Sequence, residues 1–165
     1  MRLSTILDPS CVVLDVGGGS KHDVLARLTA PIARLRPDLD AGAVLAELER
    51  REAESSTAIA DGIAIPHARP DCREVVTASL GRAPRGVDFN SLDGKPTTLL
   101  VALISPASNP ALHVQWLAHV ARVLADAGTR ERILAATTVD GILESIHERE
   151  STFDDVEHRV AKGAR

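Results

Sequence analysis

Residues 61–69 read Asp61-Gly62-Ile63-Ala64-Ile65-Pro66-His67-Ala68-Arg69, and the expected fold can be worked out from this stretch. Gly62 precedes a short apolar run with the β-branched residues that are typical of a strand. Pro66 ends strand pairing because proline has no N–H to donate. His67 is therefore expected at the end of a strand, where a side chain can reach a cleft. Arg69 follows two residues later, so a permanent positive charge can lie near the imidazole.

The length and composition of the chain indicate a single globular domain. Its 165 residues are 44% hydrophobic, which is enough to build a buried core. Two Phe, one Trp and no Tyr leave few aromatic rings for stacking on bases, and the formal net charge is −4. We expect no binding of nucleic acid, since such binding needs basic patches and aromatic platforms.

Two further features bear on location and on bound groups. The sequence has no apolar run long enough to cross a bilayer and no N-terminal signal-peptide pattern. The cytoplasm is therefore the expected location, without direct insertion into a membrane. Cys11 and Cys72 are isolated, without the Cys-x-x-Cys spacing of many zinc sites. We expect no metal and no cofactor.

Strand and helix patterns alternate along the chain. Apolar, β-branched runs predict strands at residues 11–16, 63–65, 75–80 and 97–104. Apolar side chains at helical spacing predict helices at residues 20–35, 40–54 and 110–127, with shorter helices at 129–136 and from about 138 onward. Residues 81–93 are rich in Gly, Pro and Asp and predict a loop with a short edge strand.

This alternation predicts an α/β fold, in which helices cover the faces of a sheet. We expect one domain over residues 1–147. Residues 148–165 are charged and nearly lack large apolar side chains, so a disordered tail is expected there.

Two histidines and two arginines are the candidate site residues. His113 is expected in the first turn of the helix that begins at Pro110, where free N–H groups and the positive end of the dipole suit an anion. If this helix start meets the strand end, His67 and His113 face one pocket. One imidazole could then attack a phosphoryl group while the other donates a hydrogen bond to it. Arg51 and Arg69 are the candidate cations, since a guanidinium binds phosphate oxygens through two parallel hydrogen bonds. Each residue, taken alone, is also compatible with an ordinary polar role at the surface.

Two other kinds of site remain open at this point. A strand followed by Gly17-Gly18-Gly19 and a helix resembles the first glycine-rich motif of class I methyltransferases, which holds a nucleoside cofactor. Such a motif needs an acidic residue about 20 positions further on, and Asp38 and Asp40 lie near that position without a strand before them. We expect a plain strand-to-helix turn. A thiol enzyme would pair Cys72 with His67, but the sequence offers no matching orienting group.

The ordered set of motifs resembles one protein family. The matching pieces are Arg51-Glu52, Ser56-Thr57, Asp61 to His67, Gly86-Val87-Asp88-Phe89, Asp93-Gly94-Lys95-Pro96 and His113. They are similar to the enzyme IIA component of the phosphoenolpyruvate-dependent sugar phosphotransferase system, in its fructose/mannitol and nitrogen-regulatory branch. The resemblance covers about residues 5–147.

This resemblance implies an α/β sandwich with a small mixed β-sheet. It implies that His67 accepts a phosphoryl group on a ring nitrogen from a histidine-containing phosphocarrier protein. The group then passes to a cysteine of an enzyme IIB partner for sugar uptake, or serves as a signal in nitrogen or carbon regulation. Arg51 and His113 match the phosphate-stabilising positions of the family, and Arg69 can add to the positive field. Asp61 stands where asparagine is common, which adds a carboxylate near the site.

Overall fold

The computed structural model of the protein describes residues 1–72 and 75–163, with side chains described as far as residue 153. Helices and strands alternate along the chain, as the sequence predicts. The elements, with η1 a short 3-10 helix, are α1 (Leu3–Ile6), η1 (Pro9–Cys11), β1 (Val12–Val13), α2 (Lys21–Leu35), α3 (Ala41–Glu54), β2 (Ile63–Ala64), β3 (His67–Ala68), β4 (Thr77–Val87), β5 (Thr97–Ile104), α4 (Pro110–Leu124), α5 (Ala127–Ala135) and α6 (Val139–Gly163).

The strands form one mixed sheet of five strands, in the order β1-β4-β5-β2 with β3 also paired to β5. β4 and β5 are antiparallel, whereas β1, β2 and β3 run parallel to their neighbours. β5 lies inside the sheet and is buried without interruption from Leu99 to Ile104. Its continuous apolar run suits a strand that is covered on both faces. The predicted α/β class and small mixed sheet are confirmed.

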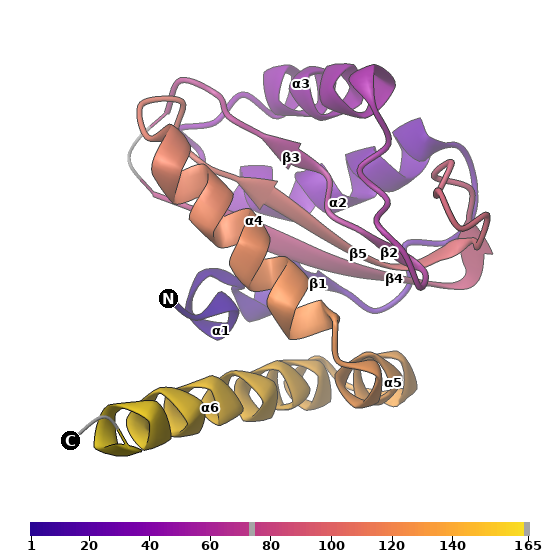
Figure 1. Ribbon diagram of the computed structural model, residues 1–165. Helices are drawn as coiled ribbons and strands as arrows, with labels where there is room; N and C mark the ends of the chain where they lie inside the picture. The colour runs from indigo at the N-terminus through magenta and orange to yellow at the C-terminus, as the bar shows by residue number, and fades with distance from the viewer. Residues whose placement is uncertain (73–74, 164–165) are drawn as a thin grey trace.

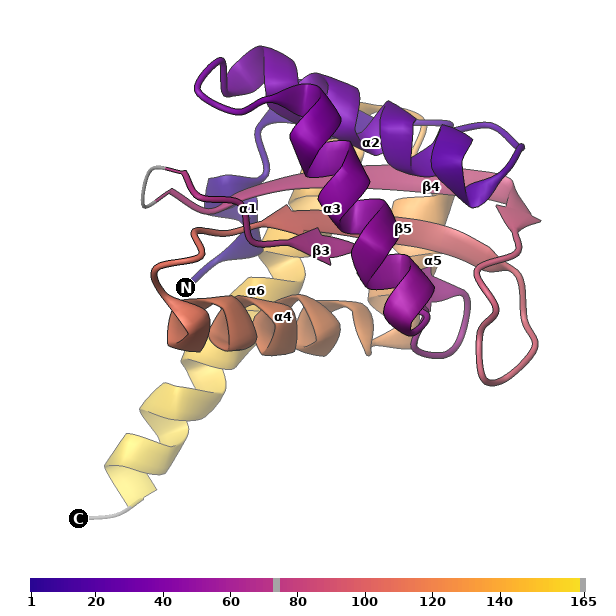
Figure 2. The same cartoon turned by 90° about the horizontal axis from the view of Figure 1, so that it is seen from above.

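Helices cover both faces of this sheet. Figure 1 shows α2 and α3 above the sheet and α5 and α6 below it. Seen from above, α3 crosses over the strands, and α4 runs along the side of the sheet on which β3 lies (Figure 2). α3 and α4 therefore both come close to β3, which begins with a candidate site residue.

Local sequence signals set the starts of the long helices. Ser20 and Asp23 form a reciprocal capping box at the start of α2. Asp40 accepts a backbone N–H in the first turn of α3. Asn109 does the same for α4, with Pro110 in the first helical position, where a missing N–H costs nothing. The cap of α4 matters most for function, because this helix start lies at the candidate site.

Two predicted strands differ from the observed ones. β4 continues through most of the segment that was predicted as a loop. Its pairing with β5 becomes irregular near its end, which accommodates Pro84 and Gly86, residues whose composition indicates a loop. The first predicted strand is shortened to β1, because the turn of η1 occupies its beginning.

The C-terminal segment differs from the predicted disordered tail. α6 continues past the expected boundary at residue 147 and ends at Gly163. Phe153 is 7% exposed, and the guanidinium of Arg122 lies 3.8 Å from the centre of its ring. Residues 148–153 are therefore packed against α4, because one aromatic side chain anchors an otherwise charged segment.

Glu150 is the second anchor of α6, and its side chain is 1% exposed. It accepts hydrogen bonds from the backbone N–H groups of Leu3 and Ser4, the latter at 3.2 Å, and so caps the start of α1. It also accepts the hydroxyl of Ser4 at 2.6 Å and lies 2.6 Å from Nε2 of His119 in α4. Hydrogen bonds hold the pKa of Glu150 below its ordinary value despite its burial. One carboxylate thus joins α1, α4 and α6.

Arg82 in β4 is buried and holds the end of α5 in place. Its guanidinium donates hydrogen bonds of 2.5–3.1 Å to the carbonyl oxygens of Leu14, Ile133, Leu134 and Ala136. We expect Arg82→Met to lower the free energy of unfolding by about 3 kcal/mol, because buried carbonyls lose their donor. Urea denaturation measures this change.

The matched control is Arg85→Met, which removes an exposed guanidinium from the same strand. A surface substitution of this kind is expected to change the free energy of unfolding by less than about 0.5 kcal/mol. Equal urea midpoints for the two variants would contradict the role given to Arg82.

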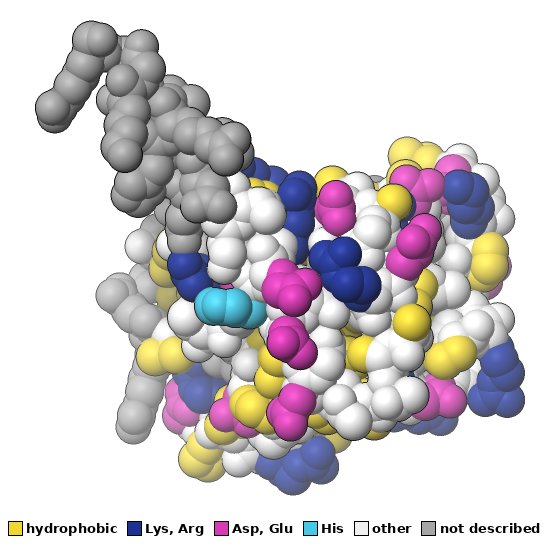
Figure 3. Space-filling model, turned by 90° about the horizontal axis from the view of Figure 1, so that it is seen from below, with side chains coloured by type: hydrophobic (Ala, Val, Ile, Leu, Met, Phe, Trp, Pro, Cys, Tyr) yellow, Lys and Arg dark blue, Asp and Glu magenta, His cyan; other side chains and the backbone are white. Residues whose placement is uncertain are grey.

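The face seen from below carries both signs of charge. Figure 3 shows basic and acidic side chains interspersed over the part of this face that the structure describes. Such mixed charge does not create the strong field of a continuous basic patch. Among the described residues, no helix combines the length and the apolar character needed to cross a membrane.

Candidate functional site

The four candidate residues come from segments that meet beside the sheet. Arg51 lies in the last turn of α3, His67 begins β3, Arg69 directly follows β3, and His113 lies in the first turn of α4. Pro66 separates β2 from β3, and both strands pair with β5. His67, expected at the end of the strand that begins at Ile63, is thus in a short strand of its own. All four side chains line one surface hollow of about 460 Å³.

Both ring nitrogens of His67 have a partner. Nδ1 lies 2.8 Å from the carbonyl oxygen of Ile65, and Nε2 lies 3.0 Å from Nε of Arg51. A carbonyl oxygen only accepts, which assigns the proton to Nδ1, and a guanidinium only donates, which leaves a lone pair on Nε2. Arg51 is itself held by the carbonyl oxygen of Ser55, at 2.9 Å. The surroundings thus select one neutral tautomer.

The charge state of His67 follows from the same surroundings. Burial lowers the pKa of His67 below its ordinary value, and the charge of Arg51 lowers it further, although the hydrogen bond to Ile65 acts in the opposite direction. At neutral pH the imidazole is therefore uncharged, and its Nε2 lone pair can act as a nucleophile once Arg51 releases its hydrogen bond to it.

His113 is the second imidazole of the hollow. It is buried, and its ring centre lies 5.2 Å from that of His67 with a tilt of 54° between the planes. Its Nδ1 lies 2.6 Å from the hydroxyl of Ser105, which is also buried. Burial is the largest cause that lowers the pKa of His113 to about 4, and the charges of His67, Arg69 and Arg51 add to it. His113 is therefore neutral at physiological pH.

We expect His113 to titrate near pH 4 in the folded protein, as against about 6.5 for an ordinary histidine. Between these values the unfolded chain binds a proton that the folded chain does not. The free energy of unfolding should therefore fall as the pH is lowered from about 6.5 to about 4, and His113→Gln should weaken this dependence. NMR titration and urea unfolding at each pH measure the two effects.

His22 serves as an internal reference in the same titration. Its hydrogen bond to Glu49 raises the pKa of His22, so its ring should titrate above the ordinary value. A titration of His113 at or above the ordinary histidine value would contradict the prediction.

Arg69 reaches from the end of β3 to the loop before α4. Its NH2 donates to the carbonyl oxygen of Ala107 at 2.7 Å, and its backbone N–H donates to Glu47 at 2.9 Å. Its Nε is buried and has no hydrogen-bond partner among the described residues. An unpaired buried N–H is unfavourable, and an acceptor that enters the hollow could relieve it.

Glu52 is a supporting residue whose role the sequence did not reveal. It is buried next to Arg51 in α3 and accepts hydrogen bonds from the backbone and the hydroxyl of Thr57, at 2.7 and 2.6 Å. Lys21 reaches across from α2 and pairs with it at 2.7 Å. These contacts hold the loop that carries Ser55, the residue that orients Arg51. The pairing of Glu52 with Thr57 lies within the family motif, but nothing in the charged run indicates which carboxylate is buried.

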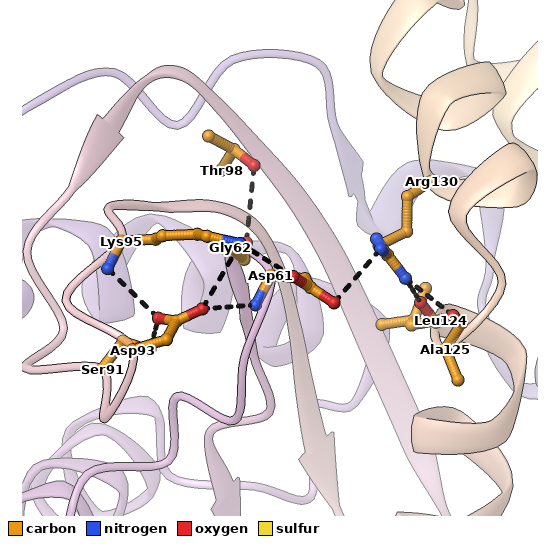
Figure 4. A network of polar contacts seen from close by, with 9 residues as sticks. All are labelled: Asp61, Gly62, Ser91, Asp93, Lys95, Thr98, Leu124, Ala125 and Arg130. Atoms are coloured by element: carbon orange, nitrogen blue, oxygen red, sulfur yellow. Dashed lines mark hydrogen bonds and ion pairs between the residues drawn. The ribbon is translucent and has the colours of Figure 1, made fainter.

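Asp61 lies at the turn that leads into β2. Its φ of 54° is in the left-handed region, which favours Gly, Asn and Asp. Figure 4 shows its carboxylate between Lys95 at 2.9 Å and Arg130 at 3.5 Å, while Asp93 accepts its backbone N–H. Asp61 is not among the residues that line the hollow. The carboxylate predicted near the site is thus engaged in fixing a turn.

The other sites considered from the sequence find little support. Within the glycine turn, the carboxylate of Asp15 accepts the N–H of Gly17, and that of Asp23 accepts the N–H of Ser20. A phosphate cradle needs such N–H groups to be free. Cys72 is not among the described residues that line the hollow. Nor do His, Cys, Asp and Glu side chains gather in threes as a metal site in the part of the chain that the structure describes.

An α/β sandwich with a neutral imidazole beside a guanidinium suits a phosphoryl-transfer component, and comparison with known families gives the class. Over residues 5–149 the chain matches the family described as phosphoenolpyruvate-dependent sugar phosphotransferase system, EIIA 2. The chain belongs to this family, so the predicted family is confirmed. Membership gives it the general role of a phosphocarrier component in a phosphotransferase system.

Individual relatives agree with this assignment. A nitrogen regulatory protein of Pseudomonas aeruginosa is 35% identical over 147 residues, which cover 88% of this chain and 95% of that protein. The crystal structure of nitrogen regulatory protein IIA-Ntr from Neisseria meningitidis has a TM-score of 0.80 and 27% identity, and the match covers 87% of this chain and 98% of that one. Enzyme IIA of the mannitol system, solved in complex with phosphorylated enzyme IIB from Escherichia coli, has a TM-score of 0.71 over 84% of this chain and 95% of that one; at 18% identity it shows the fold alone.

Proposed function

We propose that this protein accepts a phosphoryl group on Nε2 of His67 from a histidine-containing phosphocarrier protein and passes it to a partner protein. The observation that supports this most directly is the pair of contacts to the His67 ring, with Nδ1 against the Ile65 carbonyl and Nε2 against Arg51. They hold the imidazole neutral and place a guanidinium next to Nε2, and a phosphoryl acceptor needs a neutral ring nitrogen with positive charge close by.

The transfer itself is an in-line displacement between two imidazoles. Arg51 Nε first releases its hydrogen bond to Nε2, and the lone pair of His67 Nε2 then forms a bond to phosphorus while the bond from phosphorus to the donor nitrogen breaks. The electrons of the broken bond return to the donor nitrogen. The proton of His67 stays on Nδ1, hydrogen-bonded to the Ile65 carbonyl oxygen. Such transfer needs positioning and positive charge more than covalent help, so neither a metal nor a nucleotide is required.

The other residues of the hollow would hold the phosphoryl oxygens. Arg51 donates from its guanidinium, and it lies at the accepting nitrogen already. His113 can accept a hydrogen bond from the Ser105 hydroxyl on Nδ1, which leaves Nε2–H to donate to an oxygen. Arg69 has the buried Nε–H, for which the described part of the chain offers no partner. With these assignments each phosphoryl oxygen has a hydrogen-bond donor, and His67 is the single nucleophile.

Transport and regulation differ in what happens after His67 is phosphorylated. The structure of the mannitol relative contains an enzyme IIB, and a cysteine thiolate of such a partner would attack phosphorus while His67 recovers its electron pair. The similarity to nitrogen regulatory proteins favours the second use, in which phosphorylation changes the affinity for a target protein. We propose that either partner docks over the hollow, beside Val114, which is 63% exposed next to His113.

The proposal is tested by intact-mass measurement after incubation with phosphoenolpyruvate and the two general proteins of the system. We expect a mass increase of one phosphoryl group, lost on acid treatment, and peptide mapping that places it on His67. No mass increase, or a modification elsewhere in the chain, would refute the assignment. Binding of purified enzyme IIB then decides between transport and regulation.

A further inference from the structure

A carboxylate stands inside the cationic hollow. Glu47 lines it together with Arg50, Arg51 and Arg69, on the same helix as two of them. Its side chain is 25% exposed. A site that receives a dianionic group gains nothing in affinity from a negative charge, because like charges repel. The position of Glu47 therefore calls for a physical reason.

The contacts of Glu47 leave much of its charge uncompensated. Its Oε1 accepts the backbone N–H of Arg69 at 2.9 Å, a group with no net charge. Its approach to the guanidinium of Arg50 is 4.0 Å, and Arg50 is 64% exposed and also pairs with Glu54. An exposed cation shared in this way screens a neighbouring carboxylate only weakly.

Transfer between two histidines is controlled by their surroundings. The bond that breaks and the bond that forms are both between phosphorus and an imidazole nitrogen, so bond strengths nearly cancel. The equilibrium is then set by how well each protein stabilises a group that adds about −1.5 to −2 charges. Guanidinium groups and histidines in the hollow stabilise it strongly, and a carboxylate in the same hollow opposes them.

We propose that Glu47 sets the phosphoryl-transfer potential of His67 by destabilising its phosphorylated form, so that the group remains transferable to the next protein. This inference rests on the proposed function, since it concerns the same imidazole. Glu47 touches no reacting atom and acts on phosphorylated His67 through its charge alone. It acts on the energy of the product and not on the choice of nucleophile.

A simpler role for Glu47 is that of a tether between α3 and the segment after β3, through the Arg69 backbone. Glu47→Gln separates the two roles, because the amide oxygen of Gln can still accept that N–H while the charge is lost. Glu47→Ala removes both. Glu49→Gln is the matched control: it removes one negative charge from the same helix, at a position that pairs with His22 and does not line the hollow.

The experiment mixes phosphorylated phosphocarrier protein with each variant and measures the phosphorylated fraction of both proteins at equilibrium by intact mass. Glu47→Gln should shift the equilibrium constant toward phosphorylated product by roughly threefold to tenfold at low salt, and Glu47→Ala by a similar factor. Glu49→Gln should change it by less than about twofold. The shift should shrink at high ionic strength, which a tether would not cause.

Three outcomes would overturn the inference. Equal equilibrium constants for wild type and Glu47→Gln would exclude an electrostatic role. A shift of the equilibrium constant in Glu47→Ala alone would show that Glu47 acts as the tether. An equal shift in Glu49→Gln would show that the effect comes from the net charge of the protein and not from the position of Glu47. In all three the wild type still takes up phosphoryl groups, whereas failure of the wild type to do so would overturn the proposed function as well.

Discussion

His67→Gln should take up no phosphoryl group at all while keeping the fold. The amide oxygen of Gln can accept the hydrogen bond from Arg51 that Nε2 of His67 accepts at 3.0 Å, so the guanidinium keeps a partner. An amide has no basic lone pair that forms a stable bond to phosphorus. Intact mass after incubation with phosphoenolpyruvate and the general proteins should show the unmodified chain alone, and the free energy of unfolding in urea should stay within about 1 kcal/mol of the wild-type value.

The control for this prediction is His22→Gln, which changes an exposed histidine of α2. It should incorporate one phosphoryl group, as the wild type does. Phosphoryl incorporation by His67→Gln, or its loss in His22→Gln, would show that the acceptor is a different residue. Because His67 and His22 differ in burial and in hydrogen-bond partners, this comparison tests whether the surroundings of a histidine determine which one is phosphorylated.

Arg51→Lys should slow phosphoryl transfer by about a hundredfold or more. Loss of one well-placed donor to developing charge typically costs about 10²–10³ in rate. Arg51 bonds two groups at once, Ser55 through NH1 and His67 through Nε, and an ammonium group on a flexible chain cannot hold both positions. Because this variant keeps the positive charge, a slower transfer would show that the geometry of the guanidinium matters. Rapid-quench measurement of a single turnover from phosphorylated phosphocarrier protein gives the rate.

Arg34→Lys is the matched control, because Arg34 is exposed on α2 and does not line the hollow. Its rate should equal that of the wild type. A rate for Arg51→Lys within twofold of this control would remove Arg51 from the transfer step. The hydrogen bond to His67 would then serve only to hold the resting imidazole.

The candidate site could be predicted largely because its residues lie at the ends of elements. Pro66 stops one strand, Asn109 and Pro110 start a helix, and these local signals determine where His67 and His113 lie in the fold. Such signals depend on backbone chemistry within a few residues, so a sequence displays them. The state of the His67 ring could not be predicted, since it depends on a carbonyl and a guanidinium that only the folded chain brings to it.

Burial of charged residues is the feature of the fold that the sequence hid most. Arg82, Glu52 and Glu150 are charged residues that are buried, and each is stabilised by partners that are distant in sequence or in another element. A charged residue in a sequence predicts exposure because burial without partners is costly. The packing of residues 148–153 was missed for this reason, whereas the extension of β4 was missed because the Gly, Pro and Asp content of residues 81–93 indicates a loop.

The capping of α1 by Glu150 has a consequence for the order of folding. The carboxylate lies 147 positions after the N–H group of Leu3 that it binds. On the ribosome, α1 is therefore made well before the carboxylate that caps it. Contacts between such distant positions close late and at an entropic cost, so α1 lacks its cap until α6 has been synthesised.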